Sequence, residues 1–268
     1  MRLPVIHGLI RRRLLVNFRV DADVMRKFLP ALFRPKLHRG YAIAGICLIR
    51  LEHIRPAWVP RWLGISSENA AHRIAVLWDD ASGLTREGVY IPRRDTGSAI
   101  NHFAGGRIFP GEHNLADFRV TDDGVQIQMS IRARDRRMSV DLTAHETSSL
   151  PPTSCFASLA ESSSFFEGGS IGYSVTRDCC RLDGIRLETQ EWQVRPLAVD
   201  HVESSFFANQ ATFPSGTAVF DHALIMRNVI HQWHDVADLV TNGADRAARR
   251  STSSSAIPAV ETASTAVR

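Results

Sequence analysis

The chain has 268 residues, of which 44% are hydrophobic and 22% charged, with a formal net charge of +4. These values indicate a globular protein with a sizeable core and argue against membrane-spanning and disordered chains. No apolar run approaches the roughly 18 residues needed to cross a bilayer. The apolar residues Leu3 to Ile10 are followed by a triple arginine, whereas a secretory signal has its basic residues before the apolar stretch. We therefore expect a cytoplasmic protein without a membrane partner.

Composition separates a folded part from a tail. No linker rich in Gly, Ser or Pro divides the chain into halves, so we expect a single domain over residues 1–245. Residues 246–268 contain mainly Arg, Ser, Thr and Ala with little bulky apolar content, which predicts disorder.

Strand patterns dominate the first third of the chain. Residues 13–20 are rich in β-formers and end at Asp21, which can cap a helix over residues 22–29. The apolar run over residues 41–51 predicts a buried strand, and residues 74–78 predict another.

A strand over residues 86–95, with the sequence REGVYIPRRD, is the best candidate for a functional site. Alternation in an extended strand places Glu87, Ile91 and Arg93 on one face and Arg94 on the other. The two adjacent arginines are therefore expected to point in opposite directions.

The rest of the chain predicts short helices among further strands. Thr96 or Ser98 can cap a short helix that holds Asn101 and His102, and Ser154 can cap a helix over residues 155–166. Strands are expected over residues 115–120, 125–131, 138–144, 172–175, 185–191, 199–208 and 217–226.

No metal or cofactor is predicted. The four cysteines are Cys47, Cys155, Cys179 and Cys180, and they lack a Cys-x-x-Cys spacing. We expect them to be buried or incidental thiols in a reducing compartment. His231 and His234 lie three residues apart, but no third ligand is fixed, so packing or surface roles are expected.

Two other polar groups each leave two interpretations open. Glu68, Asn69 and Arg73 cluster at the start of a predicted strand, where they either hold a ligand or form a structural hydrogen-bond network. Arg132 and Arg134 alternate along a strand together with Arg136, which fits a solvated face better than phosphate binding. No nucleic-acid partner is therefore expected.

Several motifs resemble one superfamily. Residues 11–30 resemble the opening of acetoacetate decarboxylases, and Arg86-Glu87 followed by Pro92-Arg93-Arg94 resembles the segment in which Arg-Glu precedes Pro-Lys-Lys. An uncharacterised branch, the domain of unknown function 2071, is more similar still over residues 11–234. The motifs that carry this likeness are SSENAAHRIAV, GVYIPRRDTGS, FAGGRIFPGEH, FFEGGSIGYS, VESSFF and FDHALIMRNV.

The resemblance implies an α+β, β-rich fold. The expected architecture is a closed or cone-shaped antiparallel β-barrel with a few flanking short helices and an internal pocket.

The resemblance also implies that the familiar chemistry is lost. In the decarboxylase the first lysine after the proline forms a Schiff base with a keto acid, and the matching residue here is Arg93. A guanidinium stays protonated at physiological pH and cannot supply a neutral amine. The only lysines of the chain, Lys27 and Lys36, do not match that position. The family's acid in the second strand is also missing at residues 44–46.

The leading hypothesis is therefore a protein that binds a small anionic, carboxylate-bearing molecule. Arg93 either contacts this ligand or forms a structural ion pair with Glu87, Glu68 or Asp95. The expected ligand-binding residues are Arg93, Arg94, Asn69, Arg73 and Arg107.

The alternative is an enzyme that acts on a keto or hydroxy acid by acid/base chemistry, with arginine polarising the carbonyl. Its candidate acids and bases are Glu68, Glu87, His102 and His113. Homo-oligomerisation is left open by the sequence.

Overall fold

A computed structural model describes residues 4–106, 110–176 and 181–241. The predicted tail, Arg107, Cys179 and Cys180 lie outside these residues. The described chain is mostly β-strand, with the α-helices α1 (Ala22–Phe28), α2 (Ala99–Ala104) and α3 (Leu159–Glu167) and a 3-10 turn at Arg61–Leu63. None of the described helices has the length and apolar character required to span a membrane.

The strands form one extended hydrogen-bonded sheet. In chain order they are β1 (Ile6–Val20), β2 (Arg34–Pro35), β3 (Leu37–His38), β4 (Tyr41–Pro56), β5 (Ile65–Asp79), β6 (Thr85–Thr96), β7 (His113–Asp122), β8 (Gln126–Ala133), β9 (Ser139–Glu146), β10 (Ile171–Val175), β11 (Arg181–Thr189), β12 (Arg195–Ser204) and β13 (Ala218–Val240).

The sheet closes into a ring through its strand pairings. From β5 the pairings run through β6, β10, β11, β13, β1 and β4 and return to β5. The sequence predicted antiparallel pairing throughout, but β6 pairs in parallel with both β10 and β7. A parallel neighbour requires a crossover connection, and the segment that contains α2 supplies it between β6 and β7. The barrel or cone shape remains a prediction.

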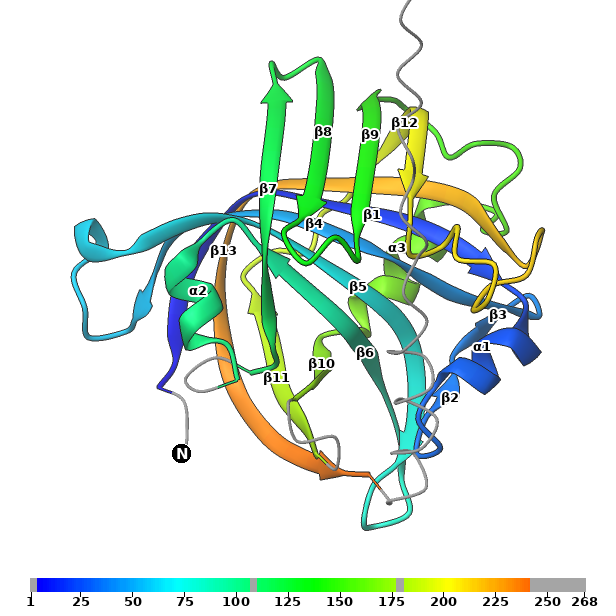
Figure 1. Cartoon of the computed structure of the whole chain (residues 1–268), viewed down its shortest axis with the longest axis horizontal. Coiled ribbons are helices and arrows are strands. Elements are labelled where there is room, and N and C mark those ends of the chain that lie inside the picture. Colours follow the sequence, from blue (N-terminus) through cyan, green and yellow to red (C-terminus); the bar gives the residue numbers. More distant parts are fainter. Residues whose placement is uncertain (1–3, 107–109, 177–180, 242–268) are drawn as a thin grey trace, which may run out of the picture.

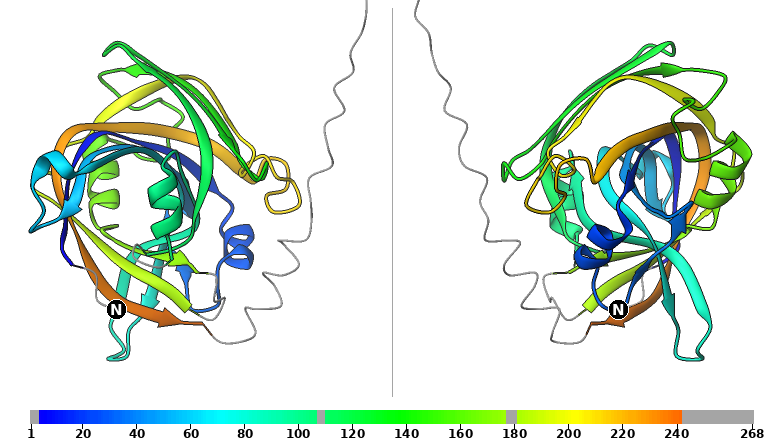
Figure 2. Two further views of the ribbon diagram at one scale, coloured as in Figure 1. Left: turned by 60° about the vertical axis from the view of Figure 1, so that its left-hand side comes forward. Right: turned by 90° about the vertical axis from the view of Figure 1, so that its right-hand side faces the viewer.

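The long strand β13 pairs with three other strands of the sheet. It pairs with β1 along most of its length, with β12 near its start and with β11 near its end. Figure 1 shows it curving around one side and the lower edge of the molecule, and Figure 2 shows the same curve from two other directions. The meander β7–β8–β9, which the sequence predicted, lies beside β12 at the upper edge of the molecule in Figure 1.

Strand β4 is buried on both of its faces. Ala44 and Ile46 pack into one hydrophobic cluster, and Ile43 and Cys47 pack into another. A strand buried on both faces requires apolar residues at successive positions, which explains the continuous apolar run in the sequence. The second of these clusters borders the candidate site.

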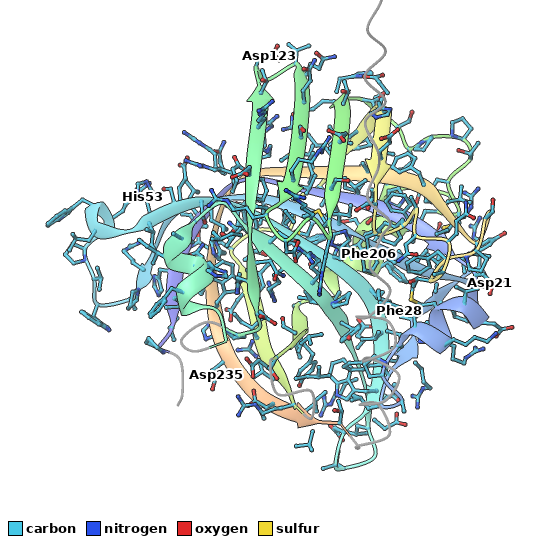
Figure 3. The ribbon with its side chains drawn as sticks, viewed as in Figure 1. Asp21, Phe28, His53, Asp123, Phe206 and Asp235 are labelled. Carbon is cyan, nitrogen blue, oxygen red and sulfur yellow. The ribbon has the colours of Figure 1, made fainter. Side chains whose placement is uncertain are left out.

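Helix α1 begins and ends where local chemistry predicts. The Asp21 carboxylate accepts hydrogen bonds from the amides of Asp23 and Val24, as expected for an N-cap. Phe28 at the end of the helix meets Phe206 edge to face at 5.9 Å between ring centroids (Figure 3). This contact packs α1 against the segment that follows β12.

Helix α3 starts later than predicted. Ser158, and not Ser154, caps it, because the Ser154 hydroxyl and the Cys155 amide both bind the Asp221 carboxylate. Asp221 lies on β13, 66 residues along the chain from Cys155, so no local pattern could have predicted this competition.

His72 on β5 is a buried histidine in an apolar setting. It is 1% exposed, and neither ring nitrogen has a hydrogen-bond partner among the described residues. Its ring packs on Phe206 at 4.4 Å between centroids. Burial lowers the pKa of His72 to about 3, and burial likewise lowers the pKa of His231 on β13 to about 4. Both side chains are therefore neutral in the folded protein at neutral pH.

These histidines predict a loss of stability in mild acid. The unfolded chain protonates His72 and His231 near their ordinary pKa of about 6.5, whereas the folded protein does not. Because the folded pKa is depressed, the stability is fully present above about pH 6.5 and decreases as the pH falls toward about 4. Each histidine contributes a slope of up to about 1.4 kcal/mol per pH unit, measurable by urea unfolding. His72→Phe should flatten the slope, and His145→Gln at an exposed position should not; an unchanged slope in His72→Phe would contradict the prediction.

Candidate functional site

A β-bulge in β6 determines which arginine enters the interior. His72 pairs with Arg93, but two positions further along β5 the partner is Tyr90, so β6 contains one extra residue between these pairs. The extra residue falls at Ile91 and Pro92, and proline lacks the amide that a ladder hydrogen bond needs. The bulge reverses the alternation predicted from the sequence. Ile91 and Arg94 therefore face the same cavity, and Arg93 points to the other face of the strand.

The cavity has a volume of about 150 Å³ and lies inside the ring of strands. Its walls are mainly apolar side chains, namely Ile49, Leu51, Ile54, Val89, Ile91, Ile185, Leu187 and Trp233. Three arginines from three strands also line it: Arg13 of β1, Arg73 of β5 and Arg94 of β6. We call these three residues the arginine cluster.

Arg73 is the most deeply buried member of the cluster. It is 5% exposed, and its guanidinium donates to Asn17 Oδ1 and lies 4.7 Å from the centroid of the Phe166 ring. Its Nε has no hydrogen-bond partner in the described structure. Burial lowers the pKa of Arg73 to about 10, so the side chain is still a cation at neutral pH.

Arg94 is held by a neutral partner. Its Nε donates to the Ser174 hydroxyl on β10 at 2.9 Å, and burial lowers its pKa to about 10. His113, at the start of β7, also lines the cavity, and its Nδ1 lies 3.1 Å from the Gly111 carbonyl oxygen. Burial, reinforced by the charge of Arg94, lowers the pKa of His113 to about 3. His113 is thus a neutral group beside a cation.

Arg13 completes the cluster, again without an anionic partner. Its Nε donates to the Cys47 sulfur at 3.3 Å, and its guanidinium lies 5.8 Å from the centroid of the Trp192 ring. Among the described residues, no carboxylate lies within 4.0 Å of Arg13, Arg73 or Arg94. Buried charges are normally paired, because desolvation of an isolated ion costs several kcal/mol.

Arg93 has the structural role that the sequence left open. It binds the buried Asp95 carboxylate at 2.7 Å and the Asp135 carboxylate at 3.0 Å. Asp95 is fully buried, so this ion pair anchors the end of β6 to the loop between β8 and β9. Arg93 is not among the residues that line the cavity.

Three of the four candidate acids and bases lie away from the cavity. Glu68 binds Arg12 through both carboxylate oxygens at 2.9 and 3.0 Å, and Glu87 binds Lys36 at 2.7 Å. His102 on α2 lies 2.5 Å from the His113 carbonyl oxygen. The structure brings only His113 of this set to the cavity wall.

Some of the predicted ligand-binding residues line the cavity and others do not. Asn69, Arg73 and Arg94 line the cavity, and Asn101 of α2 lies beside them. Asn69 is held by Thr96, whose hydroxyl donates to its side-chain oxygen at 2.8 Å. Of the polar residues on β5, Glu68 is bound to Arg12, whereas Asn69 and Arg73 reach the cavity, and a ligand-holding role for these two stays a prediction.

The sequence interpretation missed Arg13 and Asn101. Arg13 stands in a run of three arginines whose members have different environments: Arg11 is exposed, Arg12 is bound to Glu68, and Arg13 faces the cavity. The sequence signal that could have identified Arg13 is its inward-facing position in an otherwise apolar strand. Neither Lys27 nor Lys36 lines the cavity.

Other site types have little support within the described residues. No group of three or more His, Cys, Asp or Glu side chains there could hold a metal ion. His231 and His234 lie on strand β13, where a spacing of three places them on opposite faces.

Comparison with known proteins identifies a family and a fold. The model of the DUF2071 family, described as an uncharacterized conserved protein, matches residues 9–225. No curated protein matches the chain. Acetoacetate decarboxylase from Legionella pneumophila subsp. pneumophila str. Philadelphia 1 is similar in structure, with a TM-score of 0.57, 10% identity and 88% of each chain covered. An acetoacetate decarboxylase-like enzyme from Sphingomonas wittichii RW1 gives a TM-score of 0.55 at 10% identity, covering 90% of this chain and 95% of that one.

The enduracididine biosynthesis enzyme MppR, complexed with pyruvate, is also similar. Its TM-score is 0.54 at 12% identity, with 90% of this chain and 91% of that chain covered. At these identities the likeness to solved structures establishes the fold alone.

The placement of Arg93 predicts that it stabilises the fold. Arg93→Met leaves Asp95 as a buried carboxylate without its cation, which should cost about 3–5 kcal/mol in the free energy of unfolding. Arg134→Met is the matched control, because Arg134 pairs with Asp117 where both side chains are over 60% exposed, and it should cost less than about 1 kcal/mol. Urea unfolding measures both values. Equal losses in the two variants would refute the assignment, and Asp95→Asn should recover part of the stability of Arg93→Met.

Proposed function

This chain belongs to the DUF2071 family, as its motifs predicted, and we propose that it binds a small carboxylate-bearing molecule in the cavity lined by the arginine cluster. The family match over residues 9–225 includes all three arginines of the cluster. One observation carries the proposal: three guanidinium groups converge on one cavity without a carboxylate partner among the described residues.

Charge balance supports an anionic ligand. Arg73 and Arg94 remain cations despite burial. Asp95 also lines the cavity, but its carboxylate is paired with Arg93, so a carboxylate that enters the cavity would meet guanidinium groups with no carboxylate within 4.0 Å. A guanidinium presents parallel N–H donors that match the two oxygens of a carboxylate, and such charge-assisted bonds contribute about 1.5–3 kcal/mol each.

Cavity size and wall chemistry support a small ligand with an apolar part. A cavity of this volume admits a molecule about the size of benzene. The apolar wall from β4, β6 and β11 suits a short hydrocarbon portion, while Asn69 and Asn101 add neutral hydrogen-bonding groups. Short keto acids meet these requirements, and the structurally similar MppR was found complexed with pyruvate.

The proposal does not include Schiff-base chemistry. Lys27 is exposed on α1, and Lys36 is occupied by Glu87 and lies 4.4 Å from the centroid of the Phe165 ring. Lys36 borders a smaller hollow of about 30 Å³, which shares Arg13 and Arg73 with the main cavity. A charged, paired ammonium is a poor nucleophile toward a carbonyl carbon.

The enzymatic alternative now depends mainly on His113. A neutral imidazole can accept a proton or a hydrogen bond, but with a pKa near 3 it is a weak base and is not protonated to act as an acid at neutral pH. No carboxylate side chain that the sequence proposed as a catalyst reaches the cavity wall. Binding is therefore the function that the geometry supports best.

Ligand binding should depend on Arg94 and not on its neighbour. Pyruvate at about a hundredfold excess over its Kd should raise the thermal midpoint by about 5 °C or more. Arg94→Gln should abolish this shift because it removes a cavity cation, whereas Arg93→Gln should keep the shift even if its own midpoint is lower. Pyruvamide, which lacks the negative charge, is the matched control ligand. Loss of the shift in Arg93→Gln together with its retention in Arg94→Gln would reverse the assignment.

Borohydride reduction tests the absence of imine chemistry. Incubation with acetoacetate or pyruvate followed by sodium borohydride should leave the intact mass unchanged, because no neutral lysine amine lines the cavity. Acetoacetate decarboxylase treated in parallel serves as the positive control. An adduct mapped to Lys36 by peptide mass spectrometry would show that the smaller hollow supports carbonyl chemistry after all.

A further inference from the structure

Cys47 lies at the centre of the arginine cluster. It is 8% exposed, sits on β4 and lines the cavity. Arg13 Nε donates to its sulfur at 3.3 Å. Burial lowers the pKa of Arg73 and of Arg94, and the electrostatic effect of Cys47 opposes this by raising both pKa values. Arg13 therefore contacts the sulfur directly, and Arg73 and Arg94 line the same cavity beside it.

A second observation points to a ligand at the same place. Arg73 is more than nine-tenths buried and lines the cavity with an Nε that has no partner among the described residues. The Cys47 sulfur and the Arg73 side chain thus line one small chamber. An anion held by Arg73 or Arg94 would be placed against the Cys47 thiol by the size of that chamber.

Cys155 is the natural contrast within the same chain. It is buried to a similar degree, but it lies beside the Asp221 carboxylate and away from the cavity. Burial, together with the Asp221 charge, raises the pKa of the Cys155 thiol to about 12. A thiolate is the reactive form of cysteine, so neighbouring cations favour reaction and a neighbouring carboxylate suppresses it.

We infer that Cys47 is a nucleophilic site, selective for small carboxylates that carry an electrophilic carbon next to the acid group. The arginine cluster holds the carboxylate of the reacting molecule beside the sulfur. The selectivity rests on the anion binding proposed above, whereas the reactivity of the sulfur does not.

Alkylation by iodoacetate is the model reaction. The Cys47 thiolate attacks the methylene carbon, a C–S bond forms, the C–I bond breaks, and iodide leaves with the bonding electron pair. Iodoacetamide undergoes the same substitution but has a neutral amide in place of the carboxylate. The pair of reagents therefore separates the reactivity of the sulfur from recognition of the charge.

The experiment uses the full chain at about pH 7.5, below the ordinary pKa of a thiol. Rates at Cys47 and Cys155 are read from the same digests by peptide mass spectrometry. Cys47 should react at least about tenfold faster than Cys155 with either reagent. The ratio of the iodoacetate rate to the iodoacetamide rate should be about tenfold or more higher at Cys47 than in glutathione. One charge-assisted contact to the carboxylate accounts for a difference of this size. Arg94→Gln should lower this ratio.

Two results would overturn the inference. One is a rate at Cys47 no greater than that at Cys155, and the other is a reagent ratio equal to that of glutathione. Thermal stabilisation of Cys47→Ser by pyruvate reports on anion binding alone. If Cys47→Ser keeps this shift while Cys47 of the native protein does not react, the inference about the nucleophile has failed and the proposed anion binding has not.

Discussion

The interior chemistry of this protein depends on one extra residue in β6. The bulge at Ile91 and Pro92 shifts the alternation of the strand, so that the Arg94 side chain faces the cavity and the Arg93 side chain points away from it. A regular strand would do the reverse and would place the partner of Asp95 inside. Pro92 has no amide N–H to donate to the neighbouring strand, so the sequence itself favours an irregularity at this position. Both the stability of the outer face and the charge of the cavity follow from it.

Arginine has two distinct uses in this fold. On the outer faces, arginines such as Arg12 and Arg93 bind carboxylates at hydrogen-bonding distance. In the interior, Arg13, Arg73 and Arg94 have sulfur, amide, hydroxyl or aromatic partners instead. Neutral partners orient a guanidinium but leave its charge uncompensated. The apolar wall of the cavity strengthens the electrostatic effect of these charges by lowering the local dielectric.

Sequence reasoning was accurate where the determining interaction is local. The Asp21 cap, the meander β7–β8–β9 and the apolar β4 follow from neighbouring residues or from periodicity, and the motif set identified the DUF2071 family correctly. It was inaccurate where a distant residue or a bulge determines where a helix starts or which way a side chain points. The start of α3 depends on Asp221, and the alternation predicted for β6 was reversed at Arg94 by a bulge that periodicity cannot reveal. Arg13 was missed because its importance appears only when β1 takes its place in the closed ring.

The long strand β13 has a consequence for how the chain folds during synthesis. Residues 218–240 supply the edge that pairs with β1, β11 and β12, and Trp233 of this strand is part of the cavity wall. The partners of β13 emerge from the ribosome first, so β1 and β11 each keep an unpaired edge until residues 218–240 have been synthesised. The arginine cluster is thus exposed to water throughout most of translation, and its desolvation is among the final steps of folding. A nascent chain shortened before residue 240 would present an open sheet to chaperones and to other chains.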